Sequence, residues 1–81
     1  MRRYSVEISL REGGVEDPEA ITVAKNLRTL GFRVSSVATR KVYEFEFEEG
    51  EEEARKKVED IARKILTNPV IHRYEIRELD P

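Results

Sequence analysis

Hydrophobic residues along this chain recur with two different periods, and the order of those periods is the strongest constraint on its fold. Residues 3–10 alternate apolar and polar side chains, and residues 43–48 alternate strictly between aromatic residues and glutamate, which predicts two strands that each bury one face. Residues 18–30 and 51–66 instead repeat apolar side chains every three or four positions, which predicts two amphipathic helices. The two apolar stripes consist of Ala20, Val23, Ala24, Leu27 and Leu30 with Ile21 beside them, and of Ala54, Val58, Ile61, Ala62, Ile65 and Leu66. The chain therefore combines strands and helices around one core.

The residues around both helices match the ends that a helix prefers. Asp17 is a favoured N-cap residue, and Pro18 fits the first helical position, where its missing N–H costs nothing. Gly31 follows the last apolar position and can adopt the positive φ that commonly ends a helix. The second helix stops before Asn68 and Pro69, because proline cannot extend a helix and disfavours helical geometry in the residue before it. These signals fix the limits of both helices.

Two further segments complete the predicted sheet. Residues 32–39 indicate a weaker strand at an edge, because Val34 and Val37 would point to opposite faces. Residues 70–77 alternate again and predict the last strand. The order is then β-α-β-β-α-β over residues 1–81, the α+β arrangement of ferredoxin-like domains. We expect one domain with a four-stranded antiparallel sheet and both helices on its apolar face.

Size and composition exclude several classes of protein. A chain of 81 residues buries only about 60% of its unfolded surface, so we expect a second copy or a partner to contribute to its stability. Cysteine is absent, which excludes disulfides and cysteine-based metal sites. The net charge of −2 argues against a nucleic-acid surface. No signal peptide and no run of about 20 apolar residues is present, so we expect a cytoplasmic protein.

No group of residues in the sequence forms a catalytic or metal-binding motif. His72 is the only histidine and has no second ligand or nucleophile at motif spacing, so we expect it at the rim of the core. The acidic run at residues 48–53 lacks the ligand spacing of a calcium loop and fits a solvated helix start. Gly13 and Gly14 lack the lysine and third glycine of phosphate-binding loops. We expect no catalytic residue and no metal, and hence a role in binding or assembly.

One set of residues resembles a known family. The set consists of Asp17, Pro18, Leu27, Leu30, Gly31, Phe32, Val37, Lys41, Glu44, Asn68, Pro69, Val70, Ile71 and Tyr74. At this spacing the chain resembles the PurS family, the small subunits of phosphoribosylformylglycinamidine (FGAM) synthase. The run 68–71 is the sharpest part of the likeness. The chain departs at Ala20, Ala38 and Arg40, where the family commonly has glycine, arginine and glycine, so we expect a different turn near Arg40.

The resemblance implies a part in purine biosynthesis. Such small subunits are non-catalytic and join a large synthetase subunit, which uses ATP and Mg, to a glutaminase subunit that supplies ammonia. The resemblance also implies a homodimer or tetramer and no cofactor bound by this chain. The net charge and the lack of a long apolar run lead us to expect neither nucleic acid nor membrane as a partner. Lys41 and Glu44 are candidate contact residues, because no secondary-structure requirement explains them. Together with residues 68–71 and Tyr74 they form the predicted interface, whereas Asp17, Pro18 and Gly31 have structural roles.

Two other functions share this order of elements. An ACT-like regulatory domain would bind an amino acid beside a glycine-containing turn such as Gly13-Gly14. A hydrolase of the acylphosphatase type would need an arginine after the first strand and an asparagine that positions water. Arg11 lies near the first of these places, whereas Asn26 falls inside the first predicted helix. A shared fold cannot distinguish these functions, so the assembly role depends on the family resemblance.

Overall fold

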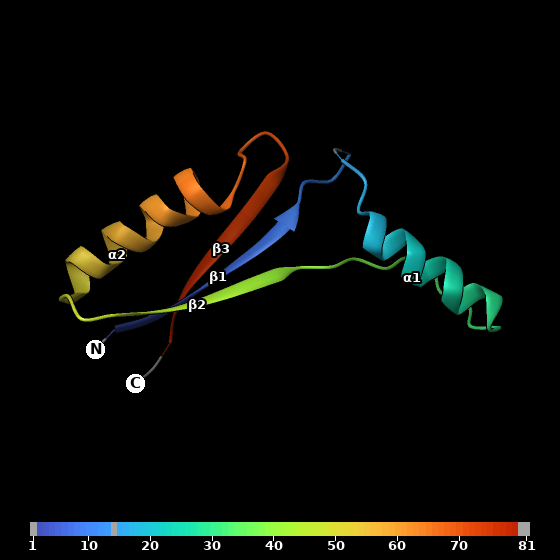
Figure 1. Cartoon of the computed structure of the whole chain (residues 1–81), viewed down its shortest axis with the longest axis horizontal. Helices are drawn as coiled ribbons and strands as arrows, with labels where there is room; N and C mark the ends of the chain where they lie inside the picture. Colours follow the sequence, from blue (N-terminus) through green and yellow to red (C-terminus); the bar gives the residue numbers. More distant parts are fainter. Residues whose placement is uncertain (1, 14, 80–81) are drawn as a thin grey trace.

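A computed structural model of the chain describes residues 2–13 and 15–79. The elements are β1 (Arg2–Leu10), α1 (Pro18–Thr29), β2 (Lys41–Phe47), α2 (Glu51–Asp60), the π-helical segment η1 (Ile61–Leu66) and β3 (His72–Leu79) (Figure 1). β1 is the central strand and pairs antiparallel with both neighbours, in the order β2-β1-β3. The predicted α+β class is confirmed.

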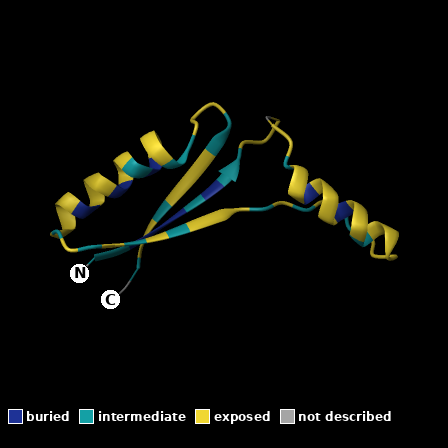
Figure 2. Cartoon of the chain, in the orientation of Figure 1, coloured by how far each residue is buried: buried dark blue, intermediate teal, exposed yellow. Residues whose placement is uncertain are grey.

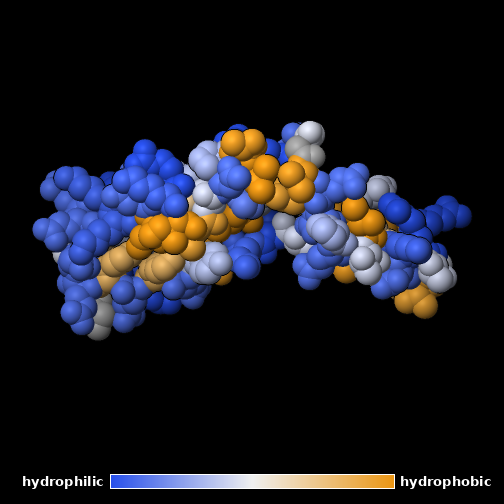
Figure 3. Space-filling model, turned by 45° about the horizontal axis from the view of Figure 1, so that its top comes forward, coloured by the Kyte–Doolittle hydropathy of each residue, from blue (hydrophilic) through white to orange (hydrophobic). Residues whose placement is uncertain are grey.

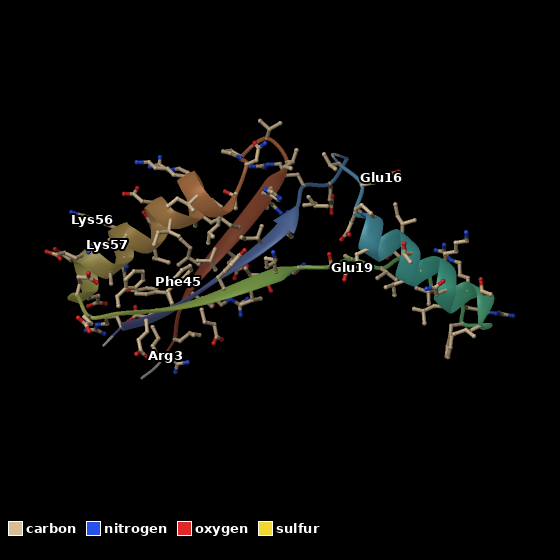
Figure 4. The ribbon with its side chains drawn as sticks, viewed as in Figure 1. Arg3, Glu16, Glu19, Phe45, Lys56 and Lys57 are labelled. Carbon is tan, nitrogen blue, oxygen red and sulfur yellow. The ribbon has the colours of Figure 1, made fainter. Side chains whose placement is uncertain are left out.

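The core lies between the sheet and the helix formed by α2 and η1 (Figure 2). It consists of Tyr4, Val6 and Ile8 from β1, Ala54 and Val58 from α2, and Ala62 from η1. The helical members are spaced by four residues, so they share one face, and their small side chains let the helix approach the sheet closely. Phe45 of β2 lies between the strand and α2 and packs against this core (Figure 4). The alternation predicted for β1 and β2 is confirmed.

The Tyr4 hydroxyl is buried and forms no hydrogen bond with the described residues. An unpaired buried hydroxyl destabilises the folded state, because it has lost its bonds to water. We therefore predict that Tyr4→Phe leaves the free energy of unfolding unchanged or raises it by about 1 kcal/mol. Urea denaturation followed by circular dichroism measures this difference. A loss of more than about 1 kcal/mol would contradict the prediction and show that the hydroxyl has a hydrogen-bond partner.

The strand predicted at residues 32–39 is absent, so the described sheet has three strands instead of four. This segment runs back along α1 instead of along β2. The Arg28 side chain holds it there, donating from Nε to the carbonyl of Val34 at 3.1 Å and from Nη2 to that of Ser35 at 3.3 Å. The outer edge of β2, where the fourth strand was expected, has no neighbour among the described residues.

The prediction that both helices cover the sheet is also wrong, because α1 lies beyond the end of the sheet (Figure 1). We call α1 and its flanking segments, residues 15–40, the arm. The radius of gyration is 16.2 Å, whereas a compact domain of this length has about 12 Å. The extents of 51 × 28 × 14 Å describe the same elongated shape. A single copy therefore leaves much of its apolar surface uncovered.

Both ends of α1 match their sequence signals. The Asp17 side chain accepts a hydrogen bond from the N–H of Ala20 at 3.2 Å, as an N-cap does. Gly31 has φ = 97°, and its N–H bonds to the carbonyl of Arg28 at 3.0 Å, while the next N–H bonds to that of Leu27 at 3.0 Å. These two bonds form the Schellman motif that commonly ends a helix at glycine. The arm thus has a well-defined helix although it stands apart.

The second helix ends in a π turn that changes which side chains face the sheet. In η1 the backbone bonds reach one residue further than in an α-helix, so each residue turns less about the axis. Ile65 was predicted in the apolar stripe, yet it is 74% exposed, while Leu66 packs against the core. The Thr67 hydroxyl donates to the carbonyl of Ala62 at 2.7 Å, five residues earlier, and closes the widened turn.

Candidate interaction site

α2 and η1 leave part of the inner face of the sheet open. An open pocket of about 390 Å³ lies there, between the end of the sheet and the start of α1. Its lining consists of Ile8, Ser9, Leu10, Glu19, Thr39, Arg40, Lys41, Tyr43, Leu66 and His72. The floor is apolar and the rim is charged. A second amphipathic helix in a β-α-β-β-α-β domain would lie on this part of the sheet, but α1 of the same copy does not.

One predicted interface residue, Lys41, lines this opening, and a second, Tyr74, lies on the same face of the sheet. Ile8 in β1 lies opposite Lys41 of β2 on one side and Tyr74 of β3 on the other, so all three share the inner face. The Lys41 ammonium lies 5.6 Å from the ring centroid of Tyr43, within the range of a cation–π contact. Glu44 instead lies opposite Ser5, on the outer face of the sheet. The predicted residues therefore divide between two faces.

The arm carries apolar side chains that stay partly or largely exposed in a single copy. Val23 is 39% exposed and Leu30 is 73% exposed, although both belong to the stripe predicted to face the sheet. Only Ala20 and Ala24 of this helix are buried, beside the returning segment of the arm. Figure 3 shows apolar atoms exposed along α1, at the right of the view. Glu19 points from the same helix toward the approach to β2 (Figure 4).

A hydrogen bond between two side chains closes the base of the arm. The hydroxyl of Thr39, just before β2, donates to the carboxylate of Asp17, just before α1. This bond and the backbone N–H of Ala20 hold the pKa of Asp17 below its ordinary value. Asp17 was predicted only as a helix cap. It also joins the two ends of the arm.

We predict that Thr39→Val makes the chain less stable at neutral pH but not in acid. Asp17 has a lower pKa when folded than when unfolded, where the value is about 3.9. Its stabilising contribution is therefore fully present above the unfolded pKa and is lost as pH falls through the folded pKa. Urea denaturation between about pH 3 and 7 should show the difference from wild type shrinking below about pH 4. Thr29→Val is the matched control, because that hydroxyl bonds to the carbonyl of Lys25 and not to a carboxylate; a pH-independent difference for Thr39→Val would contradict the prediction.

The loop at residues 68–71 joins η1 to β3 and holds itself in one conformation. The Asn68 side chain accepts from the N–H of Val70 at 3.0 Å, and its carbonyl accepts from those of Ile71 at 3.0 Å and His72 at 2.8 Å. The Asn68 N–H in turn donates to Nδ1 of the His72 ring at 2.9 Å. The last strand was predicted to begin at Val70, but Val70 belongs to this turn and is 80% exposed.

Two residues that support this loop were not predicted to do so. The N–H of Arg11, just after β1, donates to the carbonyl of Ile71 at 2.9 Å, and its Nε donates to that of Pro69 at 2.9 Å. His72 was predicted only at the rim of the core, and it does line the open pocket, but its ring also accepts the bond from Asn68. Both contacts depend on the pairing of β1 with β3, which places Leu10 opposite His72 and so brings Arg11 beside the loop. That pairing is not visible in the sequence.

The part of the chain that the structure describes contains neither a metal-binding cluster nor a membrane-spanning helix. Within residues 2–13 and 15–79, no three His, Asp or Glu side chains are arranged to hold a metal ion. Over the same residues, no helix is both long and apolar enough to cross a membrane. The glycine turn of the ACT-like alternative includes Gly14, which lies outside the described residues.

Comparison with known proteins decides between the remaining possibilities. The family model described as PurS, phosphoribosylformylglycinamidine (FGAM) synthase, matches residues 3–80. The chain belongs to the PurS family. A PurS subunit of Archaeoglobus fulgidus is 45% identical over 73 residues, which cover 88% of this chain and 90% of the relative. A PurS subunit of Methanocaldococcus jannaschii is 42% identical over 95% of this chain and 94% of its own length. The predicted family is confirmed, and with it a subunit of FGAM synthase.

Solved PurS structures share this shape. The crystal structure of PurS from M. jannaschii, described as one of the subunits of formylglycinamide ribonucleotide amidotransferase in the purine biosynthetic pathway, is 40% identical. It matches with a TM-score of 0.84 over 100% of this chain and 99% of its own, so the likeness includes the arm. A chain in the structure of PurLQS from Thermotoga maritima is 30% identical and matches with a TM-score of 0.72 over 96% of both chains.

Proposed function

We propose that this chain is the cytoplasmic, non-catalytic assembly subunit of FGAM synthase. It brings the large ATP-dependent synthetase subunit and the glutaminase subunit together and assists the transfer of ammonia between them. Membership of the PurS family supports this role, as does the related chain solved as part of PurLQS in T. maritima. No observation in the structure favours the ACT-like alternative.

The arm is the single observation that carries the proposal. The arm holds its amphipathic helix α1 away from the partly open face of the sheet that such a helix would cover. A single copy therefore exposes apolar surface at two places, on α1 and on the sheet. Burial of apolar surface is the main favourable contribution to association. A protein with this surface is built to bind other chains. Such binding requires no catalytic residues in this chain.

We propose that the first of those chains is a second copy. Val23 and Leu30 on the arm, both exposed, match the apolar floor of the open pocket formed by Leu10 and Leu66. If each copy places α1 on the partner's sheet, both sheets regain a second covering helix and the contact is two-fold symmetric. The same exchange buries surface that one copy exposes. A homodimer, or a tetramer made from it, is therefore the working form.

No cofactor is assigned to this subunit. ATP and Mg belong to the large subunit of the complex, and glutamine to the glutaminase. In the proposed dimer, Lys41 and Tyr74 lie on the inner face that the partner's α1 covers, whereas the 68–71 loop lies at one end of the sheet and Glu44 on its outer face. Two differently placed groups of residues suit a subunit that contacts two enzymes.

Reconstitution tests the assembly role. The large and glutaminase subunits from the same source are mixed with and without this chain, and glutamine-dependent formation of the product is followed. We expect little glutamine-dependent activity without the chain and a rise to saturation as it is added. Ammonia supplied directly should bypass much of that requirement. Equal glutamine-dependent activity with and without the chain would contradict the proposal.

A further inference from the structure

The 68–71 loop combines two properties that rarely occur together. Six hydrogen bonds fix it, from Asn68, Arg11 and the neighbouring backbone groups. Yet the side chain at its tip, Val70, is 80% exposed. A solvated loop does not need so many internal bonds. A loop that presents one apolar side chain in a fixed position does, because ordering it in advance lowers the entropy lost on binding.

The surface around the loop is apolar at its centre. Arg11 bonds to the loop through its backbone and side chain, so the connection from β1 to the arm lies beside it. Val15, the first residue of the arm, is 54% exposed. Figure 3 shows an apolar patch at the upper centre of the view, where these connections come forward. Contiguous apolar surface of this kind marks sites of protein contact.

Cations border the same end of the molecule. Among the described residues, neither Arg11 nor Arg73 has a carboxylate within 4.0 Å, whereas Arg40, Arg63 and Arg77 each form an ion pair. Arg73 follows the loop by two residues, at the start of β3, opposite Ser9. Two arginines without an acidic partner beside an apolar tip favour a partner that supplies carboxylates.

We propose that the 68–71 loop is a preformed docking anchor whose Val70 side chain enters an apolar pocket rimmed by carboxylates on a larger subunit of the synthase. The inference rests on the proposed function and assigns a partner surface within it. The proposed dimer contact is centred elsewhere, on α1 and on the inner face of the sheet. Val70 lies instead in the turn between η1 and β3.

Three variants of the full-length chain test the anchor. Val70→Asp places a carboxylate against an acid-rimmed pocket, Val70→Ala removes two methyl groups, and Val42→Ala is the matched control, since Val42 is 54% exposed on the outer face of β2. Each is titrated into the large and glutaminase subunits, and the concentration that gives half-maximal glutamine-dependent activity is measured. We expect Val70→Asp to raise it by about tenfold or more and Val70→Ala by several fold. Val42→Ala should match wild type.

Two further measurements distinguish a failure of the docking anchor from a failure of the proposed function. Sedimentation should find the Val70→Asp variant in the wild-type oligomeric state; a shift to monomer would place the loop in the self-association contact and overturn the anchor. Arg73→Gln should weaken the salt dependence of assembly, because it removes one charge from the contact. Wild-type affinity in Val70→Asp would also overturn the anchor. If wild-type chain itself fails to stimulate the enzymes, the proposed function fails instead.

Discussion

Val23→Glu is expected to disrupt the proposed dimer and to yield a monomer while leaving each copy folded. Val23 is 39% exposed on α1 of a single copy, and glutamate is a good helix former, so the arm itself should tolerate the change. In the proposed dimer the new carboxylate would be buried against the apolar floor of the partner's sheet. An unpaired buried charge costs about 3 kcal/mol or more, which corresponds to a dissociation constant raised more than about hundredfold.

Sedimentation velocity over a range of protein concentrations measures this effect. Lys25→Glu is the matched control, because it introduces the same side chain on the exposed polar face of the same helix. It should sediment as wild type does. Leu10→Glu, on the open part of the sheet, should reproduce the dissociation from the other side of the contact. A Val23→Glu variant that keeps the wild-type oligomeric state would show that α1 does not cover a partner's sheet.

The sequence contains the local elements of this fold but not the placement of the arm. Period-two alternation identified β1 and β2, and cap residues such as Asp17 and Gly31 set the limits of α1, because these signals depend on neighbours within a few residues. A helical stripe, however, shows only that one face will be buried. It does not show which chain buries it. The prediction that α1 covers its own sheet failed for that reason.

The missing fourth strand has a related cause. Residues 32–39 do not alternate cleanly, and a strand forms only where a neighbour satisfies its backbone groups. Here Arg28 bonds to two carbonyls of the segment instead. Ile65 was misplaced for a different reason, because a π turn changes the helical period without any signal that the apolar pattern reveals.

The candidate site was predicted in part. The proline at position 69 revealed where the helix stops, and the family likeness pointed to residues 68–71. Neither signal could show that Arg11 and His72 bond to the loop, since these contacts depend on the pairing of β1 with β3. The alternation of residues 43–48 did predict that Glu44 lies on the outer face, but the sequence did not show that β2 extends back to Lys41, which places that residue on the inner face.

Val58→Asp is expected to prevent folding altogether. Val58 is fully buried between α2 and the sheet, in a cluster that also contains Tyr4 and Val6. An unpaired carboxylate there costs several kcal/mol, while a chain of this length has a total stability of about 4–12 kcal/mol. Only one helix covers this sheet in each copy, so no other element can compensate.

Val58→Ala provides the graded test of the same core. It removes two methyl groups and should lower the free energy of unfolding by about 2 kcal/mol. Urea denaturation at one fixed protein concentration measures it, because in the proposed dimer a second copy binds only folded chain and makes the apparent stability depend on concentration. Lys56→Ala, on the exposed side of α2, should stay within about 0.5 kcal/mol of wild type. A folded Val58→Asp variant with wild-type stability would show that α2 is not the element that holds the sheet together.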